Sequence, residues 1–142
     1  MSYALSSVYP DSSFRVLTED GERVFCRGSR LGDDGNRSAV LVVLPTAEHP
    51  SPSSLDRLAH EYGLKDELDG AWAVRPLEFV REGGRAMLVL EDPGGEPLDR
   101  SLGAPMDVGR FLHLAIGIAV ALGKLHQRGP IRFVPCQSPS AR

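Results

Sequence analysis

The chain has 142 residues, of which 42% are hydrophobic and 25% are charged. This length fits one domain, or one lobe of a larger domain, and the apolar share is large enough to build a core. The formal net charge of −3 gives no overall attraction to nucleic acid or membranes, and no basic stripe with interleaved aromatic residues points to nucleic-acid binding.

The N-terminal part of the chain is predicted to hold three strands. Residues 1–13 are small and polar and are expected to form a flexible lead-in. Strands are predicted at 14–18 and 23–27, because the Asp20-Gly21 pair between them favours a tight hairpin. The continuous apolar run 39–44, ended by Pro45, predicts a strand that is covered on both faces.

A helix is predicted to follow. Ser51 can cap it, and Pro52 falls at the first helical position, where its missing N–H does no harm. One apolar stripe at helical spacing supports the helix, formed by Leu55, Leu58, Tyr62 and Leu68. Gly70 is predicted to end this unit.

Two further strands complete the predicted sheet. The strand at 73–81 is interrupted by Pro76, which predicts an irregular start, and Gly83-Gly84 predicts a hairpin turn. The last strand, 85–90, is strongly apolar. The predicted fold class is α+β, with an antiparallel sheet of about five strands and one packed helix.

The C-terminal part is predicted to contain a connector and a long helix. A short helical piece is expected at 96–102, and Pro105 and Asp107 start a helix that runs to about Gln127. Its apolar stripe is wide and includes Phe111, Leu112, Leu114, Ala115, Ile118, Ala119, Leu122 and Leu125. Residues 130–142 are expected to be disordered.

Charge is divided unevenly along the chain. Residues 1–107 hold all nineteen acidic residues and eleven basic ones, a net of −8, whereas residues 108–142 hold five basic residues and no acidic one. This pattern fits either an acidic lobe with a basic end or a basic tail for an acidic partner.

Several features predict a cytoplasmic protein. The two cysteines, Cys26 and Cys136, lie far apart and do not suggest a disulfide framework. The N-terminus lacks the basic start and long apolar stretch of a signal peptide. The most apolar run, Leu114–Gly123, has about half the length that a bilayer requires, so no membrane span is predicted.

Three segments together resemble the first half of a protein kinase. LVLEDPGGEPLD (88–99) is similar to the hinge that follows the last small-lobe strand, and HEYGLKDEL (60–68) is similar to the helix whose Glu pairs with a nucleotide-contacting Lys. FLHLAIGIAVALGKLHQRG (111–129) resembles the helix before the catalytic loop. The amino-acid sequences of these segments most resemble the kinase-like module at the front of bacterial multidomain sensor histidine kinases, and serine-threonine kinases. The resemblance implies a small lobe at 14–95, and a connector and first large-lobe helix at 96–129.

The resemblance also implies a set of nucleotide-binding residues. Glu61 corresponds to the helix glutamate, although a solvated surface charge explains it equally well. Glu91 and Asp92 would offer backbone carbonyl and N–H groups to an adenine edge, beside the hinge glycines Gly94 and Gly95, while Pro93 removes one donor. The third strand has no Lys, and the turn between the first two strands has Gly21 in place of a glycine-rich loop. At most weak ATP binding is therefore expected.

The residues that perform phosphoryl transfer are missing from this sequence. The family needs an Asp to accept the substrate proton, and an Asn and a second Asp to hold magnesium. No acidic residue follows Asp107, and the only Asn is Asn36, in an early turn. Leu64 also stands where a zinc helix beginning His60-Glu61 would need its second His. No catalytic or metal-binding residue is predicted, and Mg²⁺ is not expected to bind without the missing segment.

Three hypotheses follow. The chain is an incomplete or degenerate kinase-like domain, a pseudokinase, in signal transduction that does not transfer phosphate alone. Alternatively, it is a non-enzymatic module that binds a protein partner through the helix at 111–125, since a bare apolar face of that size is sticky. Third, the loss of resemblance after Gly129 is what a truncated or frameshifted gene product without independent function would show.

Overall fold

The computed structural model describes residues 13–128. Its elements are β1 (Phe14–Glu19), β2 (Arg23–Leu31), β3 (Arg37–Pro45), α2 (Pro52–Gly63), β4 (Pro76–Glu82), β5 (Arg85–Glu91), the 3₁₀ helix η1 (Leu98–Ser101) and α3 (Val108–Gln127). They fall into two compact units, Met1–Pro105 and Met106–Arg142, and each is described by itself. Residues 1–12 of the flexible lead-in expected at 1–13, and the disordered tail expected at 130–142, lie outside the described residues.

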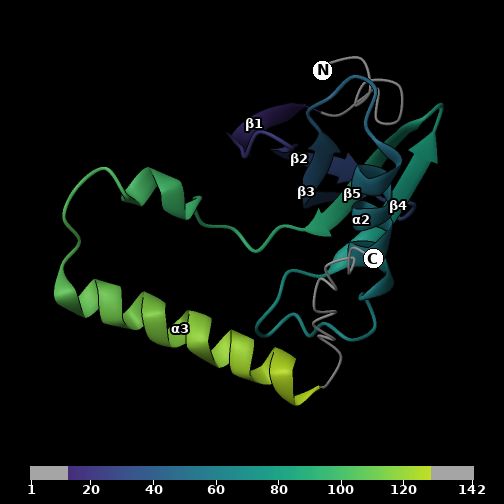
Figure 1. Ribbon diagram of the computed structural model, residues 1–142. Helices are drawn as coiled ribbons and strands as arrows, with labels where there is room; N and C mark the ends of the chain where they lie inside the picture. Colours follow the sequence, from purple (N-terminus) through teal and green to yellow (C-terminus); the bar gives the residue numbers. More distant parts are fainter. Residues whose placement is uncertain (1–12, 129–142) are drawn as a thin grey trace, which may run out of the picture. The chain divides into compact units, whose positions relative to one another are not determined.

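The first unit is built on a five-stranded antiparallel sheet with the order β1-β2-β3-β5-β4 (Figure 1). Its central strands are the most apolar ones, with Phe25 opposite Val43 and Val42 opposite Val89. The predicted fold class, α+β with a five-stranded antiparallel sheet and a long apolar helix after it, is confirmed.

Two strands are longer than their apolar patterns predict. β2 continues from 27 to Leu31 and β3 begins at Arg37, because the ladder between them runs unbroken out to the Leu31–Arg37 pair. Backbone hydrogen bonds extend a hairpin beyond its buried part, whatever the polarity of the side chains. The irregular start of β4 is confirmed, since its register against β5 shifts between Pro76 and Glu78.

The predicted hairpin turn between β4 and β5 is confirmed. Glu82 and Arg85 face each other, which leaves Gly83 and Gly84 as the two loop residues. Both have positive φ, 58° and 75°, as the two-residue turns that match strand twist require. Glycine reaches this conformation without the steric penalty that a Cβ would bring.

Two apolar clusters lie on opposite faces of the sheet. One face packs against α2 and gathers Val43, Leu55, Leu58, Ala86 and Leu88, with Phe25, Tyr62, Phe79 and Leu90 at its margin. The other face gathers Val24, Cys26, Val40, Val42, Leu44, Met87 and Val89, with Phe14 and Val80 beside them. Burial raises the pKa of the Cys26 thiol. Alternation along each strand sends neighbouring residues to opposite faces.

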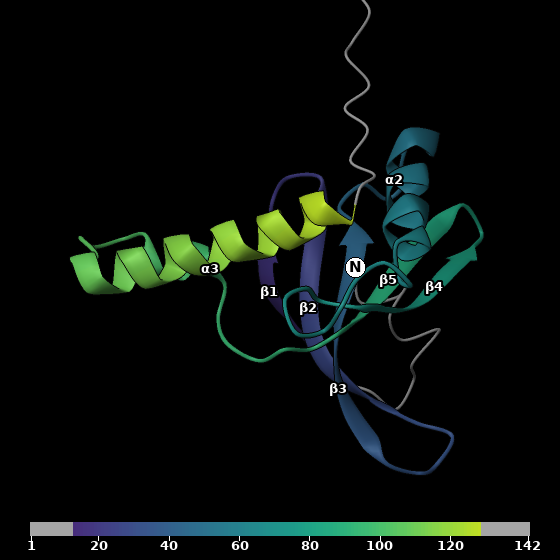
Figure 2. The ribbon, with the colours of Figure 1, turned by 90° about the horizontal axis from the view of Figure 1, so that it is seen from below.

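The helix α2 lies against β4 and β5 (Figure 2). It begins as predicted, with the Ser51 hydroxyl accepting from the Ser54 N–H and Pro52 in the first turn. The predicted end at Gly70 is wrong, because α2 stops at Gly63 and the turn that follows places Leu68 outside the helix. Glycine is a poor helix former, and the Leu64 N–H closes the last turn on the Glu61 carbonyl.

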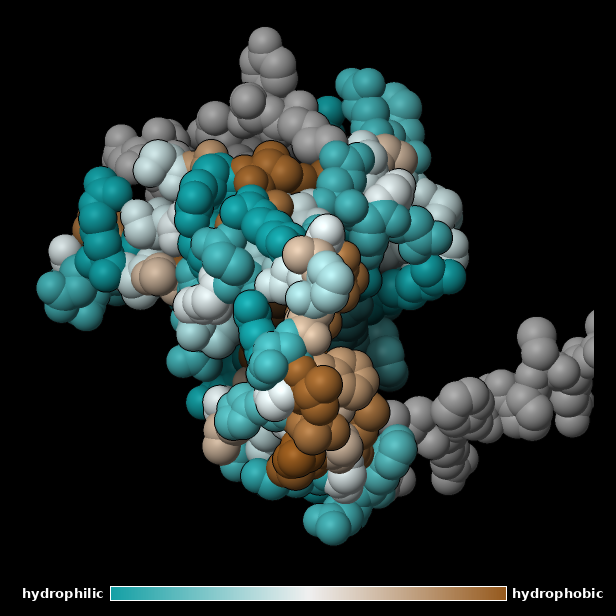
Figure 3. Space-filling view, turned by 90° about the vertical axis from the view of Figure 1, so that its left-hand side faces the viewer, coloured by the Kyte–Doolittle hydropathy of each residue, from teal (hydrophilic) through white to brown (hydrophobic). Residues whose placement is uncertain are grey.

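The second unit contains α3. The helix begins after Asp107, where the sequence predicts its start, and Asp107 caps it by accepting from the Arg110 N–H at 3.2 Å. None of its twenty residues is buried. By length and composition alone, α3 is long and apolar enough to cross a membrane, which the shorter run 114–123 is not. Figure 3 shows hydrophobic side chains gathered over this helix, with hydrophilic ones beside them.

Candidate functional site

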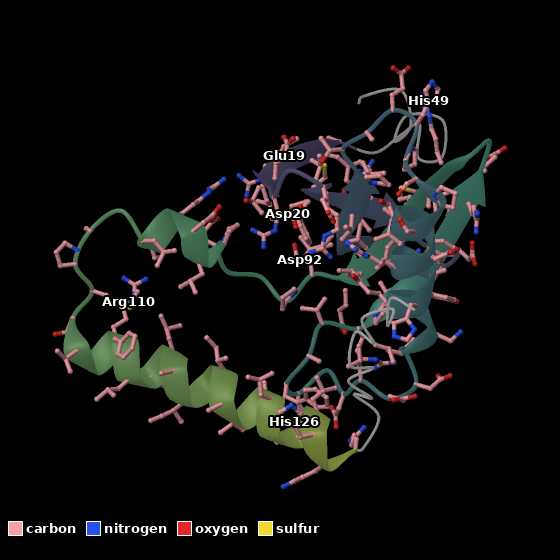
Figure 4. The ribbon with its side chains drawn as sticks, in the orientation of Figure 1. Glu19, Asp20, His49, Asp92, Arg110 and His126 are labelled. Carbon is pink, nitrogen blue, oxygen red and sulfur yellow. The ribbon has the colours of Figure 1, made fainter. Side chains whose placement is uncertain are left out.

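The candidate site is the hinge that leaves β5, together with the connector that follows it. β5 ends at Glu91, and Asp92 begins the connector (Figure 4). The Glu91 N–H donates to the Arg75 carbonyl at 2.9 Å, so this hinge donor is used within the chain. Pro93 has no N–H. Two of the backbone donors that an adenine edge would seek are therefore engaged or missing.

The Asp92 side chain points to β2 and forms the best-buried ion pair described in residues 13–128. It accepts from Arg27 Nε at 2.7 Å and from Arg27 Nη2 at 3.1 Å, and the two side chains are only 5% and 18% exposed. A guanidinium fork suits a carboxylate in this two-bond geometry. Asp92 thus holds the hinge to β2 through its side chain, a role that the sequence did not predict.

The charge of Asp92 is stabilised where it lies. Burial alone would raise the pKa of this carboxyl, but the hydrogen bonds from Arg27 and from the Gly94 N–H outweigh it, so the pKa lies below its ordinary value. The Gly94 N–H donates to Oδ1 at 2.8 Å. Gly94 and Gly95 both have φ of 77°, and no atom lies within 4 Å of a Cβ built on either. These two glycines are needed for backbone conformation and leave space beside them.

The connector is fastened to the β1–β2 hairpin by further polar contacts. Arg27 also lies 3.7 Å from Glu96, and Arg100 pairs with Glu96 at 2.7 Å. Arg100 donates to the Leu17 carbonyl at 3.2 Å. The Thr18 hydroxyl donates to Asp99 at 2.8 Å. We call this set of contacts, including Arg27–Asp92, the connector clasp.

Glu61 has a partner, but the partner comes from another strand than the resemblance implies. Its carboxylate accepts from Arg23 Nη1 at 3.1 Å. Arg23 begins β2, pairs with Asp20 as well, and lies over the Phe25 ring at 5.3 Å from the centroid. On β3, the residue that packs in the α2 cluster is Val43, which carries no charge. The structure therefore joins Glu61 to β2.

A shallow pocket of about 160 Å³ adjoins this pair. It lies along α2 and is lined by Glu22, Arg23, Pro45, Ser54, Arg57, Leu58 and Glu61. Its charged walls are paired with one another, since Arg57 contacts Glu22 at 2.9 Å and Arg23 contacts Glu61. Paired charges of both signs leave little net field to attract a phosphate group.

The sequence-predicted residues are thus split between two places. Asp92, Gly94 and Gly95 form one continuous hinge, while Glu61 lies on α2 in a separate ion pair. Arg23 pairs with Glu61 and Arg27 with Asp92, and both arginines lie on the face of β2 on which Phe25 packs toward α2. Sequence reasoning missed these arginines. The available signal was their period-two spacing around Phe25 in β2.

Within residues 13–128, no group of three or more His, Cys, Asp or Glu side chains could hold a metal ion. No protein-family model matches this chain, and the search of curated proteins found no match. The kinase resemblance therefore remains a hypothesis that depends on the order of the elements and on the three segments quoted above.

Proposed function

We propose that this chain is a non-catalytic, kinase-like module of cytoplasmic signal transduction that acts by binding and does not transfer phosphate. The observation that carries the proposal is the Arg27–Asp92 pair, which bridges β2 and the hinge with both side chains largely removed from water. In a nucleotide-binding small lobe, the base would have to enter beside that hinge. In this chain, Arg27 and Asp92 bind each other at that position and stabilise the fold.

The remaining contacts agree with weak nucleotide binding. Val43 supplies no cation on the α2 side of β3, and Glu61 is occupied by Arg23. The Glu91 N–H is already bonded to Arg75. ATP would meet one proline and one engaged N–H at the hinge, so we expect a dissociation constant in the millimolar range. Mg²⁺ should add nothing, because no Asp or Asn follows Asp107 to hold it.

The binding role is assigned to α3. Its large apolar residues are exposed, with Phe111 at 59% and Ile118 at 53%. A helix that is apolar over most of its surface is stable only when something covers it. A protein partner for residues 111–125 is the second candidate function, and replacing Leu114 and Ile118 with Glu should abolish such an association.

The test of the proposal is thermal unfolding with ATP in the presence and absence of Mg²⁺, together with a phosphotransfer assay on a general protein substrate. At 5 mM ATP, a dissociation constant of about 5 mM adds about 0.4 kcal/mol, or roughly 2–3 °C in Tm. A constant of about 50 µM would add about 2.7 kcal/mol and more than about 10 °C.

We expect the small shift, the same shift with Mg²⁺, and no phosphate transfer. GTP at the same concentration is the control for non-specific anion effects. A large shift that Mg²⁺ increases, or measurable transfer by the purified chain, would overturn the proposal.

A further inference from the structure

The helix α3 has a surface that is apolar on all sides but one. Six residues, spaced alternately by three and four, form a first stripe along the helix: Val108, Phe111, Ala115, Ile118, Leu122 and Leu125. A second stripe, spaced by four, is formed by Leu112, Ile116 and Val120, which are 51%, 62% and 50% exposed. Ala119 falls between the two stripes, and Gly123 falls within the second. The apolar surface is therefore continuous across both.

The remaining side is basic. At about 100° per residue, Arg110, His113, Lys124 and Arg128 fall within a sector of about 60°. No acidic residue occurs from Val108 to the end of the helix. Figure 4 shows Arg110 near the first turn and His126 near the last. His126 falls about 160° away from Arg110, on the side of the first stripe, and does not belong to the basic sector. The helix therefore combines a broad apolar face with a narrow cationic one.

Although α3 passes the test of overall length and composition for a membrane span, its uncharged stretch is short for one. Between Arg110 and Lys124 lie thirteen residues without Asp, Glu, Lys or Arg, which rise about 20 Å along a helix. The hydrocarbon core of a bilayer is about 30 Å thick. Stretches of this length are typical of buried core helices or of helices that lie in the membrane interface.

A single helical partner would also leave much of α3 uncovered. Pairing along the first stripe buries a narrow seam and leaves Leu112, Ile116 and Val120 in water. A lipid surface instead accepts the whole apolar face, while the basic sector remains with the headgroups. Anionic headgroups supply the negative charge that the helix itself lacks.

We propose that α3 binds an anionic lipid surface, lying in the plane of the interface with its two apolar stripes immersed and its basic side outward. The inference rests on the proposed function, since it names the partner of a non-catalytic binding module. It requires no span of the bilayer and is compatible with a cytoplasmic protein that binds the inner leaflet.

The experiment is flotation of the full chain with large unilamellar vesicles. One set contains phosphatidylcholine only, and the other contains phosphatidylcholine with 30 mol% phosphatidylglycerol. We expect binding to the anionic vesicles at 0.1 M salt, at least tenfold weaker binding to the neutral ones, and a marked loss at 0.5 M salt because charges at the surface are screened.

Charge variants make the test specific to α3. Each basic residue near an anionic surface contributes about 1 kcal/mol, or about fivefold in affinity. R110Q/K124Q should therefore weaken binding about thirtyfold. The matched control is R57Q/R85Q, which removes the same two charges from exposed positions in the first unit and should change binding less than twofold. I116N should weaken binding about tenfold or more, whereas L31N, at another exposed apolar residue, should not.

The outcomes separate the lipid proposal from the proposed function. No vesicle binding, equal binding to both vesicle types, or equal effects of R110Q/K124Q and its control would overturn the lipid proposal. Self-association in the absence of lipid that I118N abolishes, without vesicle binding, would also overturn it and would assign α3 to a second copy of the chain. The proposed function is tested separately, because only the ATP-binding and phosphotransfer measurements can overturn it.

Discussion

Replacing Asp92 with Asn tests whether the hinge carboxylate is structural. The substitution keeps the shape of the side chain and an oxygen for the Gly94 N–H, but removes the charge that Arg27 contacts through two hydrogen bonds. Arg27 would keep only a neutral oxygen at position 92, with Glu96, at 3.7 Å, as its remaining carboxylate partner. Leaving a fully buried charge without its partner costs about 3–5 kcal/mol. Because Arg27 is 18% exposed and water can reach it, we expect a loss of about 2–3 kcal/mol in the free energy of unfolding.

The loss should depend on pH in a defined direction. The pKa of Asp92 is lower in the folded chain than its ordinary value of 3.8. Its contribution is therefore fully present above that ordinary value and disappears as the pH falls through the folded pKa. The difference between the parent and D92N should be constant from pH 7 to about pH 5 and should shrink below pH 4.

Urea unfolding followed by far-UV circular dichroism measures both quantities. The matched control is E48Q, which also removes one carboxylate charge, from a side chain that is 79% exposed and 3.9 Å from Arg85. Exposed pairs of this kind contribute about 0–1 kcal/mol. If D92N costs no more than E48Q, or if its effect does not change between pH 7 and pH 3, the structural role given to Asp92 is refuted.

Two packing predictions test the sheet. A Cβ at Gly28 would contact the Phe14 ring and lie 2.7 Å from the Ser13 carbonyl oxygen, so G28A should displace β1. We expect a loss of about 1–3 kcal/mol in the free energy of unfolding by urea, and faster amide exchange along β1. Unchanged exchange in β1 would contradict this prediction. L58A removes a side chain that is 2% exposed between α2 and the sheet, and it should lower the free energy of unfolding by about 3 kcal/mol. The control L77A, at a side chain that is 39% exposed, should lower it by less than about 1 kcal/mol. Similar losses in both variants would contradict the described core.

The sheet could be predicted from the sequence because its signals are local. The apolar runs at 39–44 and 85–90 are bounded by turn residues, and Gly83-Gly84 fixes a hairpin between adjacent strands. The capped start of α2 at Ser51-Pro52 and the start of α3 at Asp107 are equally local. Such features depend on a few neighbouring residues, and each was confirmed.

The clasp could not be predicted because its contacts join residues far apart in the chain. Arg27 and Asp92 are separated by 65 positions, and Thr18 and Asp99 by 81. Nothing local to either residue specifies such a pair. The end of α2 was misplaced for a related reason. Leu68 fits the helical stripe by spacing, but it follows a glycine and a turn that closes on the Glu61 carbonyl.

The clasp also explains where the first compact unit ends. The boundary expected from the sequence falls after residue 95, whereas the units divide after Pro105. Contacts from Glu96, Asp99 and Arg100 to β1 and β2 hold the connector to the sheet. The boundary after residue 95 is the one that the kinase resemblance implies, since it groups the connector with the following helix.

The clasp limits the length of free chain that precedes α3, because it binds the connector to the β1–β2 hairpin. With η1 held to the hairpin, residues 102–107 are the free chain between η1 and α3, and this segment reaches about 20 Å when fully extended. If all contacts of the clasp break, the free segment extends over residues 92–107 and reaches about 55 Å when fully extended. Opening the clasp would therefore lengthen the free chain that precedes α3 without unfolding the sheet.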